Sequence, residues 1–199
     1  MLQTNGRSHT QTLHQLVADR FACSTAVPDT FFVTEANRIA EACWAMARRF
    51  QGNGRLLAFG NGAAASDAQH VAVEFVHPVI VGKRALPALA LTNERGLLGG
   101  LPLDHHLAAL ARPQDIALGF SLTGREPDIL AALHQAQEMG LLTLGLTAHD
   151  GGDLLKMPLD FCFVVENNDP LVVQETHETL YHILWELVHV FFEHEGLLN

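Results

Sequence analysis

The sequence is short of cysteine and of basic residues, and each shortage narrows what the chain can be. Its three cysteines, Cys23, Cys43 and Cys162, are widely spaced and form no Cys-x-x-Cys pair. This argues against a disulfide framework and fits a reducing cytosol, with Cys43 and Cys162 as core thiols in apolar surroundings. Because 12 basic residues face 22 acidic ones, for a formal net charge of -10, direct binding to nucleic acid is not expected.

Long apolar runs are also missing. The most apolar stretch, residues 183–192, is interrupted by Glu186 and His189 and is too short to span a bilayer. Residues 1–12 are polar and lack the apolar core of a secretory signal. We therefore expect a cytoplasmic protein that does not interact with the membrane.

What is present is typical of a folded globular protein. The chain has 199 residues, of which 48% are hydrophobic and 17% charged, enough for a substantial core. No repeat, low-complexity tract or linker divides it. We expect one domain over residues 1–199, made of a helical extension (1–52) and an α/β core with a C-terminal helix (53–199).

Hydrophobic periodicity predicts the elements. Two helices are expected first, at residues 10–21 and 34–50, separated near Pro28, with Thr34 as the N-cap of the second. Five short apolar runs then alternate with helical stretches, which indicates βαβ units and a mainly parallel sheet with helices on both faces. The runs are 56–59, 86–91, 116–120, 141–146 and 161–165, and the helical stretches are 64–76, 103–111, 127–139 and 152–156. Pro87 argues against a strand over the whole second run, since proline fits the start of a strand better than its middle.

The last helix is expected over residues 170–194. Asp169 is its expected N-cap and Pro170 lies in its first turn, where proline is favoured. Gly196 follows its end.

Three loops after predicted strands have the composition of ligand-binding turns. In open parallel sheets, ligands bind at the carboxyl ends of the strands, where small residues allow close approach and free N–H groups favour an anion. The hydroxyls of Ser121 and Thr123 add donors for phosphate oxygens. Ordinary turns between strand and helix are the alternative. The loops are 60–64 (Gly-Asn-Gly-Ala-Ala), 121–124 (Ser-Leu-Thr-Gly) and 147–152 (Thr-Ala-His-Asp-Gly-Gly).

Two helices carry polar residues at four-residue spacing. His70 and Glu74 share one helix face, and Gln174, Glu178 and His182 share another. Imidazole with carboxylate is a common zinc ligand set, and a carboxamide oxygen can complete it. Surface ion pairing is the alternative for each face. The pair His105-His106 points in two directions and is interpreted as loop or surface.

The loops and helix motifs described above, taken in their order along the chain, resemble those of the sugar isomerase (SIS) domain family. The resemblance covers nearly the whole chain and is strongest to the phosphoheptose (sedoheptulose 7-phosphate) isomerase group. The resemblance implies a three-layer αβα sandwich of flavodoxin-like, doubly wound type and a homotetramer with sites at subunit interfaces. The motifs that carry it are Gly60-Asn61-Gly62 with Asp67-Ala68-Gln69-His70 and Glu74, Ser121-x-Thr123-Gly124, Leu146-Thr147 with Asp150-Gly151-Gly152, and Gln174-Glu175-x-His177 with His182.

The resemblance also implies the site. One zinc ion per subunit is expected on His70, Glu74, Gln174 and His182, and the acid/base pair is expected to be Glu74 and His182. A phosphorylated sugar is expected to contact Asn61, Gly62, Ala63, Ser121, Leu122, Thr123 and Gln174. Aldose–ketose isomerisation passes through an enediol and needs a base, an acid and a group that stabilises an oxyanion. Glu74 fits the base and His182 the acid, with the reverse assignment open.

The sugar and phosphate contacts depart from the family pattern. Where the family has Gly-Asn-Gly-Gly-Ser, this chain has Gly60-Asn61-Gly62-Ala63-Ala64, and where it has Ser-Thr-Ser-Gly-Asn-Ser, this chain has Ser121-Leu122-Thr123-Gly124-Arg125-Glu126. An Asn-Asp pair is missing from residues 92–100, and Leu171 and Val172 replace an acidic residue. A carboxylate about 4 Å from a phosphate costs roughly 1 to 4 kcal/mol, part of which Arg125 offsets.

Retained metal-type residues with an altered phosphate loop indicate an isomerase whose substrate has changed. The first hypothesis is therefore a zinc-dependent isomerase of sedoheptulose 7-phosphate or a related sugar. The second is a non-catalytic SIS adaptor that binds a phosphosugar or a protein, similar to the relative that binds the bacterial replication initiator. The third is a metal site that acts on a substrate without phosphate.

Overall fold

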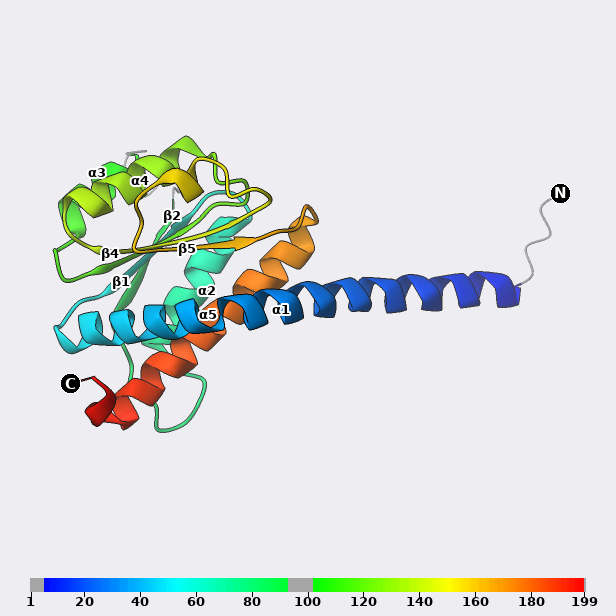
Figure 1. Ribbon diagram of the computed structural model, residues 1–199, viewed down its shortest axis with the longest axis horizontal. Helices are drawn as coiled ribbons and strands as arrows, with labels where there is room; N and C mark the ends of the chain where they lie inside the picture. Colours follow the sequence, from blue (N-terminus) through cyan, green and yellow to red (C-terminus); the bar gives the residue numbers. More distant parts are fainter. Residues whose placement is uncertain (1–5, 93–101, 199) are drawn as a thin grey trace.

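The five apolar runs form one parallel sheet in the computed structural model of the protein, which describes residues 6–92 and 102–198 (Figure 1). The strands lie in the order β2-β1-β3-β4-β5, and every neighbouring pair is parallel. The chain moves outward from β1 to β2 and then returns to the other side of β1, so the carboxyl ends of β1 and β3 flank a topological switch point. The strands are β1 (Leu56–Gly60), β2 (Ala88–Thr92), β3 (Ile116–Phe120), β4 (Leu142–Ala148) and β5 (Phe161–Val165).

Helices cover both faces of the sheet, as Figure 1 shows. The two faces are separated by the alternation of side chains along each strand: Leu56 packs with the helices of one face, whereas Leu57 packs with those of the other. This confirms the predicted three-layer αβα sandwich. One face carries α1 (Gly6–Gln51), α2 (Ala64–Val76) and α5 (Pro170–Glu193), and the other carries α3 (Leu103–Leu110), α4 (Pro127–Glu138) and the short 3-10 helix η1 (Leu154–Lys156).

The N-terminal segment is one helix of 46 residues, so the prediction of two helices separated near Pro28 was wrong. Thr34 is not an N-cap, because its hydroxyl donates to the carbonyl of Thr30 within the helix, at 3.0 Å. Upstream of Pro28, Arg20 forms ion pairs with Asp169 (2.5 Å) and Glu175 (3.2 Å) at the start of α5. Packing of α1 against the core, in which Val27 and Phe31 lie on either side of Pro28, continues the helix through a residue that usually interrupts one.

Smaller boundary differences have local causes. β2 begins at Ala88 and ends at Thr92, not at residues 86–91, because Pro87 cannot donate to the strand ladder. The predicted helical stretch at 152–156 shortens to η1, since Gly151 and Gly152 adopt positive φ angles of 77° and 57° before it.

The C-terminal helix confirms its predicted start. Asp169 caps it, with the side chain accepting hydrogen bonds from the backbone N–H of Leu171 (2.9 Å) and Val172 (3.4 Å), and Pro170 occupies the first turn. The helix ends at Glu193, one residue before the predicted end, and the 3-10 helix η2 (Glu195–Leu197) follows.

Several single-residue predictions can also be checked. Cys43 and Cys162 are buried free thiols, as expected. His106 was predicted to be a loop or surface residue and is instead buried, because it lies one turn after Leu103 on the inner face of α3. Within residues 6–92 and 102–198, no helix combines the length and apolarity that a membrane span requires. The segment 93–100, where the Asn-Asp pair is missing, lies outside the described residues.

Candidate active site

Helices α2 and α5, which are far apart in the sequence, lie on the same face of the sheet and bring together three of the four residues predicted to hold a metal ion. Helix α2 starts directly after β1 and carries His70 and Glu74 one turn apart, and α5 carries His182. Glu74 Oε1 lies 3.0 Å from His182 Nε2 and 3.6 Å from His70 Nε2. One ligand atom from each of the three residues lies within 4.8 Å of the others. The four-residue spacing on α2 and the position of His182 on α5 therefore produce one joint cluster of three residues.

Glu74 is the least exposed member of this cluster. Its side chain is 13% exposed, whereas those of His70 and His182 are each 44% exposed. Burial raises the pKa of Glu74 above its ordinary value, and the neighbouring His182 and His70 oppose that rise. Its second oxygen, Oε2, is buried and has no hydrogen-bond partner among the described residues. A buried carboxylate oxygen without a partner is costly unless a ligand or ion uses it.

The other ring nitrogen of His70 is held from α5. Tyr181 Oη lies 2.8 Å from His70 Nδ1, and Glu178 Oε1 lies 3.5 Å from the same nitrogen. This fixes the ring so that Nε2 faces Glu74, an orientation typical of metal-ligating histidines. Sequence analysis missed Tyr181, which has the pattern of an apolar core position; its place three residues after Glu178 was the available signal.

Gln174 lies next to the cluster through a different contact. Its Nε2 donates to Asp67 Oδ1 at 3.1 Å and lies 3.4 Å from Ser66 Oγ. Burial raises the pKa of Asp67 to about 6, although the hydrogen bond from Gln174 works in the opposite direction. Gln174 thus connects the first turns of α5 and α2 beside the three clustered residues.

His177, part of the motif that carried the resemblance, is not in the cluster. It is buried against β4, with Nε2 3.1 Å from the carbonyl oxygen of Thr147. Burial lowers its pKa to about 4, although this hydrogen bond favours the charged form. It is a core histidine in this structure.

The loop after β1 lies beside the loop after β3, at the switch point. Asn61 Nδ2 is 3.5 Å from Asp128 Oδ2 at the start of α4, and Gly62 has a φ angle of 59°. The first backbone N–H groups of α2 already donate to loop carbonyls, Ala64 to Asn61 at 3.1 Å and Ser66 to Ala63 at 3.1 Å. Asn61, Gly62 and Ala63, which are predicted to contact the sugar, form a tight turn between β1 and α2.

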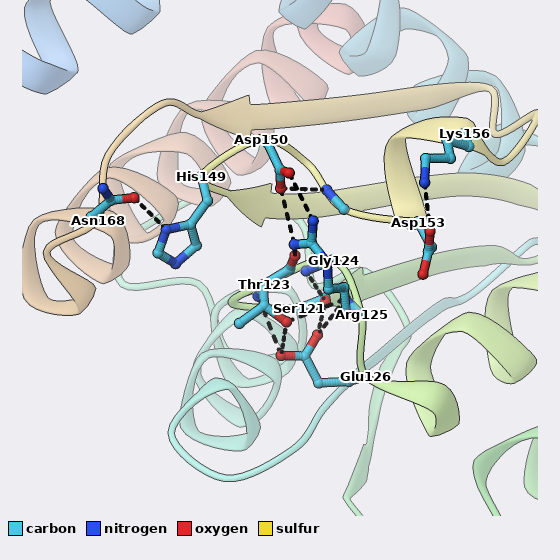
Figure 2. Close-up of polar contacts among 11 residues, drawn as sticks. Ser121, Thr123, Gly124, Arg125, Glu126, His149, Asp150, Asp153, Lys156 and Asn168 are labelled. Atoms are coloured by element: carbon cyan, nitrogen blue, oxygen red, sulfur yellow. Dashed lines mark hydrogen bonds and ion pairs between the residues drawn. The ribbon is translucent and has the colours of Figure 1, made fainter.

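The loop after β3 was predicted to hold phosphate, and Figure 2 shows that the side chain of Glu126 points into it. Ser121 and Thr123 direct their hydroxyls to this carboxylate. The side chain of Leu122 packs against the apolar core instead. Leu122 therefore directs no hydroxyl or other polar group into the loop.

Beside this loop lies an open cavity of about 1070 Å³ at the carboxyl ends of β4 and β5. It is lined by Thr123, Arg125, His149, Asp150, Glu166, Asn167 and Asn168. His149 adopts a positive φ of 59°, and its Nδ1 is 2.5 Å from Asn168 Oδ1. Sequence analysis named the loop at 147–152 but not the contribution of Asn168.

Comparisons by sequence and by structure lead to the same group of known proteins. A sequence profile described as the SIS domain matches residues 21–148. The chain is 37% identical over 179 residues to the phosphoheptose isomerase of Desulfovibrio desulfuricans, covering 85% of each chain. It is 35% identical to that of Solidesulfovibrio magneticus, covering 90% of this chain and 91% of the relative. The structure of phosphoheptose isomerase from Neisseria gonorrhoeae superimposes with a TM-score of 0.78 at 27% identity, covering 88% of this chain and 98% of the other.

Proposed function

Since the chain belongs to the SIS domain family and to its phosphoheptose isomerase group, we propose that it isomerises sedoheptulose 7-phosphate or a related sugar between ketose and aldose. The activity class, a phosphosugar isomerase, follows from the relatives. The observation that supports the chemistry is the contact of Glu74 with both His182 and His70 across two helices.

The proposed roles follow from what the reaction requires. Glu74 removes the proton from the carbon next to the carbonyl, and the electron pair moves to form an enediolate with its charge on the former carbonyl oxygen. His182 donates a proton to that oxygen. Delivery of the abstracted proton to the former carbonyl carbon, with loss of the hydroxyl proton on the carbon that was first deprotonated, places the carbonyl on that carbon and completes the exchange. The described geometry is equally compatible with exchanged roles for Glu74 and His182.

The residues present fit a zinc ion. Two imidazole nitrogens and a carboxylate oxygen within 4.8 Å form a ligand set of the kind that catalytic zinc sites use. The unpartnered Oε2 of Glu74 and the outer-sphere contact of Tyr181 with His70 agree with this. His70, Glu74 and His182 would hold the ion, with Gln174 as the proposed fourth ligand. Zinc would supply positive charge that stabilises the enediolate oxygen.

The proposal extends to assembly and compartment. The part of α1 before Pro28 projects away from the sheet in Figure 1. It exposes Leu13, Leu16, Val17 and Phe21, each more than half accessible. Exposed apolar side chains on one projecting helix favour burial against other copies of the chain, in line with the proposed homotetramer. Three free cysteines support a cytoplasmic setting.

The test combines turnover with metal analysis of the purified protein. We expect isomerisation of sedoheptulose 7-phosphate and about one zinc per subunit by mass spectrometry of the metal. Loss of zinc to a chelator should abolish turnover, and added zinc should restore it. A protein that binds no zinc, isomerises no ketose phosphate and is isolated with a stoichiometric protein partner would instead be an adaptor.

A further inference from the structure

The loop after β3 is filled by a side chain of its own. The carboxylate of Glu126 accepts hydrogen bonds from the Ser121 hydroxyl, from the Thr123 hydroxyl at 2.9 Å and backbone N–H at 3.2 Å, and from the Arg125 N–H at 3.2 Å. These dashed contacts surround the carboxylate in Figure 2. Hydroxyl and backbone N–H groups that converge on one point form a typical anion-binding concavity. In this structure, the bound anion is the carboxylate of Glu126.

The contacts act on the charged form of Glu126. Burial alone would raise its pKa, but the hydrogen bonds from Ser121, from the backbone of Glu126 itself and from Thr123 together outweigh burial and hold the pKa below its ordinary value. The side chain is therefore an ionised acceptor that competes for the same donors as a phosphate oxygen would.

The nearest cation offers no unopposed positive charge. The Arg125 guanidinium makes two hydrogen bonds to Asp150, at 2.9 and 2.7 Å, and one to the carbonyl of Thr123 at 3.0 Å. Asp153 is paired with Lys156 at 2.7 Å. The carboxylates of Glu126, Asp150 and Asp153 thus outnumber the two cations with which they are paired or adjacent, Arg125 and Lys156. A phosphate that entered the loop would meet both the carboxylate of Glu126 and an arginine that is already paired.

We propose that Glu126 is an internal competitor for the phosphate of the substrate and a specificity-determining residue of this site. A phosphorylated sugar binds in the loop only when the carboxylate of Glu126 leaves it. The phosphate group therefore adds less to the binding affinity of a sugar than it would in a loop without this carboxylate. The identity of the sugar rests on the proposed function, whereas the competition for the loop does not.

The test compares Glu126→Ser with wild type by calorimetric titration with inorganic phosphate. Serine removes the competing charge and leaves a short hydroxyl that can donate. We expect the dissociation constant for phosphate to fall about tenfold or more. Glu126→Gln removes the charge but keeps an acceptor oxygen, so a smaller fall is expected. Glu138→Gln, at the exposed far end of α4, makes the same change in net charge and should leave phosphate affinity unchanged.

Titration with sedoheptulose and sedoheptulose 7-phosphate then measures specificity. The dissociation constant of sedoheptulose divided by that of sedoheptulose 7-phosphate should rise in Glu126→Ser by about the factor seen for phosphate. Unchanged phosphate affinity in both Glu126 variants, or a change equal to that in Glu138→Gln, would overturn the proposal. If Glu126→Ser does not fold, Glu126→Gln alone decides it. Binding is measured without turnover. Tighter phosphate binding by the Glu126 variants of a protein that isomerises nothing would therefore refute the proposed function but still support the proposed role of Glu126.

Discussion

Glu74 Oε1 lies 3.0 Å from His182 Nε2, although the two residues come from helices at opposite ends of the α/β core sequence. The contact exists because α2 and α5 lie side by side on the same face of the sheet. His70 joins from one turn earlier on α2. A carboxylate held between two imidazoles can exchange protons with a substrate or bind a cation, and both uses lead to measurable consequences.

Substitution Glu74→Gln should abolish most activity. The amide keeps the size of the side chain but cannot take a proton and is a weak metal ligand. We expect kcat to fall by about 100-fold to 10,000-fold, with loss of bound zinc. Initial rates and metal content measure the two effects, and Glu138→Gln is the matched control on an exposed glutamate. Full activity in Glu74→Gln would exclude the proposed role.

Tyr181→Phe tests the contact behind His70. The variant keeps the buried ring and removes only the hydroxyl that lies 2.8 Å from His70 Nδ1. Outer-sphere partners of metal-ligating histidines typically contribute about 10-fold to 100-fold to metal affinity or activity. We therefore expect weaker zinc binding, measured by competition with a chromogenic chelator, in a protein of near-normal thermal stability. Zinc affinity equal to that of wild type would mean that the hydroxyl serves only the core.

The sequence was sufficient for the elements that follow simple periodicity. Five apolar runs predicted five strands, and of the four residues predicted to form one cluster, the structure brings together His70, Glu74 and His182, with Gln174 beside them on Asp67. The sequence was not sufficient where contacts between segments far apart in the chain determine the local structure. Contacts of Val27 and Phe31 with the core support a helix through Pro28, which local propensity does not favour.

The same limit applies around the site. The hydroxyl of Tyr181 acquires its role only because α5 lies against α2. His177 shares the motif of the site, yet packing places its ring against β4 and not toward the cluster. The replacement at Glu126 was visible in the sequence, but the return of its carboxylate into its own loop depends on the backbone path there.

His177 should make stability depend on pH. Its pKa is about 4 in the folded protein, against 6.5 for an unperturbed histidine, so between these values the unfolded chain binds a proton that the folded chain does not. This contribution to stability is complete above about pH 6.5 and is lost as the pH falls toward 4. From pH 7.5 to 5, wild type should lose about 2 kcal/mol more than His177→Gln in urea unfolding. His134→Gln, at an exposed histidine, should follow the wild-type profile. Parallel profiles for wild type and His177→Gln would contradict the burial effect.

The projecting half of α1 should govern assembly. Introducing two charges with Val17→Glu and Phe21→Glu puts carboxylates into the apolar stripe, both positions being well exposed in the single chain. We expect light scattering after size exclusion to report a smaller particle than wild type, since burying unpaired charges is costly. Val81→Glu, at another fully exposed apolar position, is the control and should keep the wild-type mass. A double variant of unchanged mass would place the interface elsewhere.

Asp115 should be the most sensitive acidic residue outside the site. Its side chain is fully buried and accepts hydrogen bonds from the backbone N–H of Arg55 at 2.8 Å, the Arg55 guanidinium at 2.6 Å and the backbone N–H of Arg112 at 3.0 Å. These contacts join the residue before β1 to the loop before β3. Removing the carboxylate leaves the backbone N–H groups of Arg55 and Arg112 without their acceptor, and at about 1 to 3 kcal/mol for each unsatisfied donor the loss is about 2 to 6 kcal/mol, whereas the Arg55 guanidinium is 23% exposed to water. We expect Asp115→Ala to lower the free energy of unfolding in urea by about this amount.

The matched control for Asp115 is Asp153→Ala, which breaks an ion pair of similar length, 2.7 Å, between Asp153 and Lys156. Both partners there are mostly exposed, and exposed pairs contribute little because water and salt screen them. The two variants remove the same carboxylate group from the same fold, so the difference between them isolates burial. Equal losses of stability would show that the buried hydrogen bonds of Asp115 are replaced by water when the side chain is removed. A large loss confined to Asp115→Ala would show that this carboxylate holds the amino ends of β1 and β3 together, and with them the two loops that flank the site at the opposite ends of these strands.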